Sequence, residues 1–163
     1  MWSDLRTEID QIRQRLELSE QDFTPLPFTT NWAKLEDNLY HAFCRLDHPT
    51  ARPLWLWERF RPGAVVLVCD DEPRNHLTSF VNPEEVVWLV LNETVNMGDK
   101  FWFYQGTPRA IGRVLDECCY LDEIYLVSKK YAWLLCMNHH RVLFGIGSPM
   151  QERLLAGRAQ HIT

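Results

Sequence analysis

His139 and His140 form the only adjacent histidine pair of the chain, and they follow Asn138 at the end of an apolar run. Imidazole changes protonation near neutral pH, so either side chain could act as a general base or ligate a metal. Adjacent strand residues point to opposite faces of a sheet, so only one of the two can face a given site. The motif therefore allows catalysis by His139 or His140. A strand ending whose side chains hydrogen-bond a turn, or a contact with a partner, is the commoner role for such residues.

Two metal sites are compatible with the residue types. Zinc could be held by one of these histidines together with a cysteine, and magnesium by the acidic run Asp70-Asp71-Glu72 with carboxylates from other strands. The sequence has no HExxH or paired CxxC motif, and a solvated acidic turn is commoner than a metal site. We therefore predict no metal and no cofactor. The further residues available are Cys118, Cys119 and Cys136 for zinc, and Glu84, Glu85, Glu93 and Asp99 for magnesium.

Other catalytic signatures are missing from the sequence. There is no GxSxG nucleophile motif, and the segment Gly145–Ser148 lacks the lysine and glycine spacing of a phosphate-binding loop. The five cysteines show no disulfide pattern, so we expect reduced and mostly buried thiols.

Charge is unevenly distributed along the chain. The net charge is −5, with −9 over residues 1–123 and +4 over residues 124–163. An acidic body argues against nucleic-acid binding, which needs a basic surface, and suits a basic protein partner. Solubility alone would explain the same imbalance.

Aromatic residues make up 12% of the chain and include seven tryptophans. Several lie on predicted strands, where alternation should turn some of them away from the core. Exposed Trp and Tyr beside acidic residues are typical of protein-binding surfaces, although a rich core would account for many of them. The predicted partner-binding residues are Asp70, Asp71, Glu72, Trp102 and Tyr104.

Helical spacing is clearest near the N-terminus. Leu5, Ile9, Ile12 and Leu16 lie on one face of a first amphipathic helix. A connector with two prolines over residues 19–31 precedes a second predicted helix over residues 32–46. Later, Thr107-Pro108 predicts the start of an inserted helix, and Ser148 with Gln151 predicts a capping box that opens a C-terminal helix.

Short apolar runs between these helices predict strands. The β-branched run over residues 64–69 is typical of a central strand covered on both faces, and residues 96–99 are typical of a hairpin turn. The order of elements predicts a single α+β domain over residues 1–163 with a mainly antiparallel sheet. Its parts are a helical region (1–50), a sheet region (54–147) and the C-terminal helix (148–163). The predicted strands span residues 54–57, 64–69, 86–91, 101–104, 124–127, 133–137 and 142–146.

The segment EIYLVSKKYAWLLCMNHH over residues 123–140, with VVWLVLNE before it and FWFYQG between, resembles a family of small bacterial proteins of unknown function. Its most specific part is the W-L-x-C-x-N-H-H string that begins at Trp133. The chain departs from that pattern at Ile124, where an aromatic is expected, and at Arg141, where an acid is expected. In element order and acidity it is also similar to SMI1/KNR4-like immunity proteins, which bind and neutralise toxins.

These likenesses, the acidic body and the aromatic content predict a non-enzymatic bacterial binding protein, in particular an immunity protein that occludes a basic toxin domain. No apolar stretch could span a membrane and no signal peptide is evident, so we expect a cytoplasmic location. The alternative is a hydrolase or nuclease-like enzyme that uses the Asn138-His139-His140 edge, with or without a metal. A regulatory or scaffold domain is a third reading.

Overall fold

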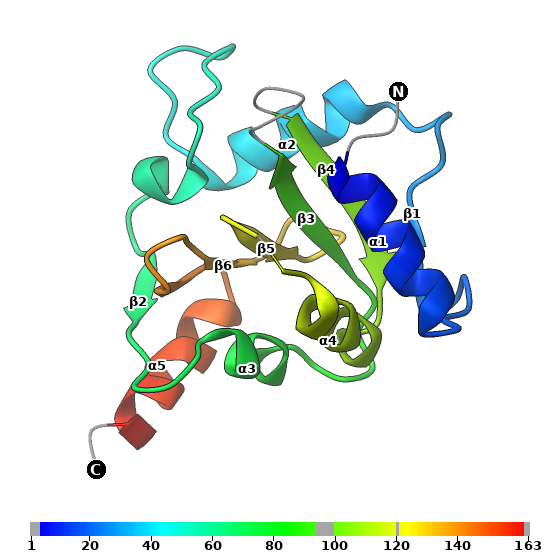
Figure 1. Ribbon diagram of the computed structural model, residues 1–163. Helices are drawn as coiled ribbons and strands as arrows, with labels where there is room; N and C mark the ends of the chain where they lie inside the picture. The colour runs from blue at the N-terminus through cyan, green and yellow to red at the C-terminus, as the bar shows by residue number, and fades with distance from the viewer. Residues whose placement is uncertain (1–3, 94–99, 120, 162–163) are drawn as a thin grey trace.

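The fold is seen in a computed structural model that describes residues 4–93, 100–119 and 121–161. The described residues form one seven-stranded sheet flanked by helices (Figure 1). The strands are β1 (Phe23–Pro25), β2 (Val65–Leu67), β3 (Val87–Glu93), β4 (Lys100–Gly106), β5 (Ile124–Val127), β6 (Leu134–Met137) and β7 (Leu143–Ile146). Their order across the sheet is β1-β4-β3-β5-β6-β7-β2, and every neighbouring pair is antiparallel.

Helices cover both faces of this sheet. The helices α1, α3, α4 and α5 pack on one face, and α2 with a 3₁₀ turn, η1, packs on the other. Their bounds are α1 (Asp4–Arg15), α2 (Trp32–Phe43), α3 (Arg74–Leu77), α4 (Pro108–Glu117) and α5 (Met150–His161), with 3₁₀ turns η1 (Leu56–Arg59) and η2 (Thr78–Phe80).

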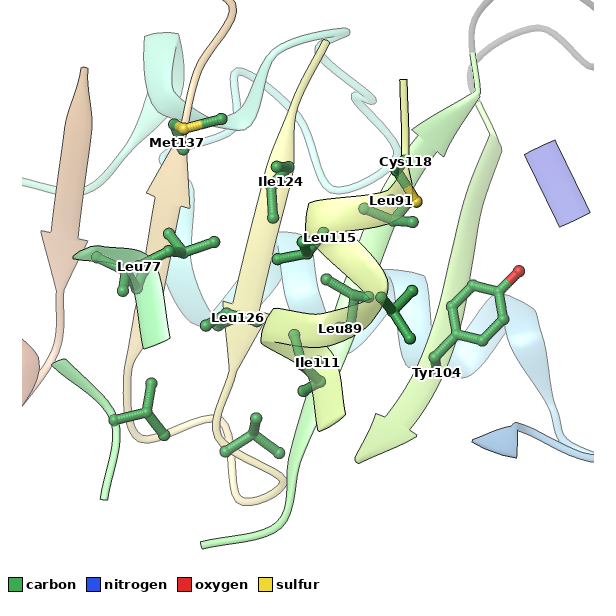
Figure 2. Packing of buried hydrophobic residues seen from close by; sticks show 14 of the residues in the cluster. Leu77, Leu89, Leu91, Tyr104, Ile111, Leu115, Cys118, Ile124, Leu126 and Met137 are labelled. Carbon is green, nitrogen blue, oxygen red and sulfur yellow. The ribbon is translucent and has the colours of Figure 1, made fainter. Parts of the chain in front are cut away.

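The central strand β5 carries large apolar or aromatic side chains at every position because both faces of the sheet are covered. In β5, Ile124 and Leu126 belong to the core beneath α4, whereas Tyr125 and Val127 belong to the core beneath α2. Figure 2 shows the first of these cores, with leucines of β3 and β5 lying under α4. All four β5 residues are buried, so this strand forms a rigid base for whatever its ends carry.

The predicted α+β architecture is confirmed, with two helices before the main sheet, one inserted helix and a C-terminal helix. The predicted start of the inserted helix is correct, because the Thr107 hydroxyl accepts a hydrogen bond from the backbone N–H of Ala110 at 3.3 Å. The predicted strand over residues 124–127 coincides with β5. The predicted hairpin turn over residues 96–99 lies outside the described residues.

The run over residues 64–69 is not a central strand. Only Val65–Leu67 is a strand, and it lies at the sheet edge, paired with β7 alone. Val68 is 68% exposed, so the continuous apolar run does not reflect coverage on both faces. An apolar run predicts a strand but carries no information on which strand pairs with it, and that pairing decides burial.

Three local expectations also differ from the structure. The run over residues 54–57 leads into the 3₁₀ turn η1 instead of a strand, and β1 lies within the predicted connector. The capping box is not formed, because the Gln151 side chain donates to the carbonyl of Gly63 while the Ser148 hydroxyl contacts Glu152.

Within the described part of the chain, no helix has the length and apolar character needed to cross a membrane.

Candidate functional site

The turn between β6 and β7 carries the histidine pair, and Asn138 builds this turn. The buried Asn138 side chain accepts hydrogen bonds from the backbone N–H groups of His140 at 3.1 Å and Val142 at 3.0 Å. Arg141 takes a positive φ of 63°, which a tight turn of this kind requires. Asparagine suits this position because its short amide can replace backbone partners in a turn. The expected strand ending with a hydrogen-bonded turn is therefore present.

Glu123 is the carboxylate partner of His139. It lies directly before β5, and the pairing of Ile124 with Met137 brings it beside the β6–β7 turn. Its Oε1 accepts from the backbone N–H of His139 at 3.2 Å and lies 2.6 Å from the ring Nδ1 of the same residue. Glu123 is completely buried, whereas the His139 side chain is 32% exposed. The fold thus gives the histidine pair a carboxylate partner that the sequence around the pair does not show.

Burial raises the pKa of Glu123, and the hydrogen bonds from His139 and Trp57 offset that rise only in part. The Trp57 indole N–H donates to Oε1 at 3.3 Å. On the other carboxylate oxygen, the Tyr125 hydroxyl and the Cys136 thiol approach at 3.5 Å and 3.7 Å. Glu123 is thus a buried acid that holds the histidine turn and the Trp57 segment against the start of β5.

Two tryptophans pack against the histidines. The Trp55 ring centroid lies 4.9 Å from that of His139, and the Trp57 ring lies 5.9 Å from that of His140. The two imidazole rings are 4.1 Å apart and both contact Trp57, so the expectation that only one histidine can face a given site is wrong. Both residues lie in the turn after β6, where strand alternation no longer applies. Trp55 and Trp57 are half-buried and both histidines are exposed. We call Trp55, Trp57, His139 and His140 the histidine–tryptophan patch.

The patch carries imidazole groups that could exchange protons with a substrate. Because Glu123 holds Nδ1 of His139, the other ring nitrogen, Nε2, remains to meet a substrate or a partner. Among the described residues, no three His, Cys, Asp or Glu side chains are grouped so that they could hold a metal. Cys136 is fully buried against Glu123, and Cys118 lies in the core on the opposite sheet face.

The acidic turn after β2 lies next to this patch. Glu72 forms an ion pair with Arg141, the residue that follows His140. Asp71 pairs with His76 at 2.7 Å, and Asp70 is exposed. Glu72 therefore connects the acidic turn to the β6–β7 turn. The other candidate magnesium ligands do not join them in one group within the described residues, and Asp99 lies outside those residues.

Trp102 and Tyr104 do not accompany the acidic turn. They are 5% and 3% exposed on β4, on the sheet face that α1 and α4 cover, and Figure 2 shows Tyr104 in that core. The Trp102 indole N–H donates to Glu93 at 2.7 Å, and Arg6 of α1 stacks over its ring at 4.5 Å. Strand alternation alone cannot predict this burial, because both faces of β4 are covered. Trp55 and Trp57 are more exposed than these two residues.

A family model describes almost the whole chain. It covers residues 1–158 and is that of DUF6756, a family of unknown function. The chain belongs to the DUF6756 family. The prediction of a small family of unknown function is thereby confirmed. No curated protein and no solved structure matches this DUF6756 chain.

DUF6756 membership supplies no activity, so the site rests on its geometry. The residues that sequence reasoning missed are Glu123, Trp55 and Trp57. A signal for Glu123 was present, because an antiparallel hairpin that pairs residue 124 with residue 137 places residue 123 opposite residue 138. No comparable local signal links Trp55 and Trp57 to the histidines, since this contact depends on the path of the chain after α2.

Proposed function

We propose that the protein is a cytoplasmic, non-enzymatic binding protein that occludes a basic protein partner, as an immunity protein occludes its toxin. The observation that carries this proposal is the histidine–tryptophan patch, four partly exposed rings beside the acidic turn. Tryptophans are strongly enriched among residues that dominate binding energy, and polar groups commonly surround them.

The patch is suited to binding because it is fixed before a partner arrives. The buried Glu123 holds both His139 and Trp57, and the Trp57 ring stacks on Phe144 of β7 at 5.6 Å. Rings that are already ordered lose little conformational freedom on association. Asp70 and Asp71 add exposed negative charge in the same turn as Glu72, and this charge would speed encounter with a basic surface.

Co-expression with the product of the neighbouring gene tests this proposal. We expect a stable complex on size-exclusion chromatography and protection of cells from a toxic partner. Trp55→Ala should weaken the complex at least about tenfold, the loss typical of a dominant interface residue. Phe28→Ala is the matched control, because Phe28 is an aromatic that is 75% exposed and lies outside the patch. Absence of both complex and protection would reject the immunity role.

Salt dependence separates the acidic rim from the aromatic centre. Asp70→Asn with Asp71→Asn should slow association at low ionic strength and lose its effect at high salt, because exposed charges are screened. The Trp55→Ala effect should instead appear in the dissociation rate at every salt concentration.

A second candidate is supported by the 2.6 Å contact between Glu123 and His139. A carboxylate on Nδ1 orients the imidazole so that Nε2 can remove a proton from water, which is the first step of a hydrolase using His139 as general base. Assays of ester and phosphodiester hydrolysis with wild type, His139→Gln and His140→Gln would test it. Activity lost only in His139→Gln would favour the enzyme. A stoichiometric metal in untagged protein that is lost on His139→Ala would favour its metal-dependent form.

A further inference from the structure

A separate cavity of about 340 Å³ lies in the segment that joins α2 to η1. This segment projects from the body at the upper left of Figure 1. Three arginines line the cavity, Arg45, Arg52 and Arg59, together with one acid, Asp47, and the polar residues His48 and Thr50. None of the lining residues belongs to the histidine–tryptophan patch. In a chain of net charge −5, such a concentration of guanidinium groups calls for a physical reason.

Backbone pairing holds two of these arginines together. Cys44 and Phe60 form an antiparallel bridge, and the Arg45 N–H donates to the carbonyl of Arg59 at 2.7 Å. The pair Arg45 and Arg59 therefore lies directly across the two chain segments. Like charges at opposite positions destabilise such a pairing. The backbone pairing fixes the relative placement of the two residues.

Nearby acids compensate only part of this charge. Arg52 pairs with Asp37 at 2.7 Å, and Arg59 lies 3.7 Å from Asp47, a long contact between two side chains that are each more than half exposed. Three guanidinium groups thus face two carboxylates. Within the described residues, no hydrogen bond or ion pair engages the Arg45 side chain, so the surplus positive charge belongs to it.

We propose that this cavity binds the phosphate group of a small molecule. A phosphate offers three free oxygens, enough to accept from the forks of both Arg45 and Arg59, whereas a carboxylate offers two. His48 and Thr50, whose side chains lie 3.0 Å apart, add hydrogen-bonding groups at the wall. A volume of 340 Å³ is near the lower end for ligand pockets, which suits a small phosphomonoester.

Titrations followed by amide NMR test the proposal, with inorganic phosphate, glycerol 3-phosphate and succinate at constant ionic strength. We expect saturable shifts at residues 45, 50 and 59 with both phosphates, and weaker binding of succinate. Arg45→Gln should reduce phosphate affinity about tenfold or more, as expected for loss of a charged hydrogen bond. The phosphate affinity of Arg45→Lys should lie between those of wild type and Arg45→Gln, because lysine keeps the charge but cannot form two parallel hydrogen bonds to the phosphate.

Arg109→Gln is the matched control, since it removes the same charge from α4 on the opposite sheet face. It should leave the phosphate affinity unchanged. Shifts that do not saturate, succinate binding as tight as phosphate binding, or an equal loss in Arg109→Gln would each overturn the proposal. Unchanged circular dichroism spectra and melting temperatures would show that the Arg45 variants remain folded, so that a lost affinity reports on the site.

Discussion

Glu123 and His139 are 16 residues apart in the chain, yet Oε1 of the first lies 2.6 Å from Nδ1 of the second. The antiparallel pairing of β5 with β6 creates this contact, because the residue before one strand meets the residues after the other. The carboxylate is fully buried and the imidazole is partly exposed. The pair therefore links the rigid core to the histidine–tryptophan patch, and its removal should affect both.

Glu123→Gln should lower the free energy of unfolding by about 2 kcal/mol, because its amide has one acceptor oxygen and its NH₂ group would face groups that donate to the carboxyl group. Urea denaturation measures this change. Asp122→Asn is the control, since Asp122 is the exposed neighbour, and it should change stability by less than about 0.5 kcal/mol. Equal effects of the two substitutions would show that the Glu123 contacts contribute nothing specific.

The raised pKa of Glu123 predicts a pH dependence of stability. Because burial places its folded-state pKa above the ordinary value of 4.5, the native state holds the proton more tightly than the unfolded state. Its stabilising contribution is present at low pH and is lost as pH rises through the raised pKa. The unfolding free energy of wild type minus that of Glu123→Gln should thus decrease with rising pH in urea titrations. A difference that increases would contradict this account.

Replacing Trp102 by phenylalanine should reduce stability more than the same substitution at Trp55. Trp102→Phe removes the donor to the buried Glu93 carboxylate, so it should cost about 1–3 kcal/mol of stability. Trp55→Phe retains a ring at a half-buried position and should cost less than about 1 kcal/mol. Thermal and urea unfolding of the two variants measure this contrast. If Trp102→Phe left stability unchanged, its place in the core would be in doubt.

Local pattern was enough to predict most elements but not their neighbours. The runs around β3 and β5 are apolar because helices cover both sheet faces, and this composition is visible in the sequence. The run around β2 looks the same, yet it lies at an edge, since its only strand partner is β7. Burial of Trp102 depends on α1 lying over β4, a long-range contact. The contact between Glu123 and His139 is partly predictable from the sequence, because the register of the β5–β6 hairpin places the two residues close together.

Two glycines should respond to alanine with opposite signs. Gly147 has a φ of +82°, and a Cβ there would overlap the backbone of Ala132, so Gly147→Ala should destabilise the fold by more than about 1 kcal/mol. Gly112 lies inside α4, where a Cβ would meet only Thr78 side-chain atoms at 3.6 Å, an ordinary contact distance. Gly112→Ala should therefore stabilise by about 0.5–1 kcal/mol, because alanine loses less conformational entropy in a helix. Melting temperatures of the two variants measure both signs. A stable Gly147→Ala variant would mean that the β7–α5 junction does not require a left-handed backbone conformation at this residue.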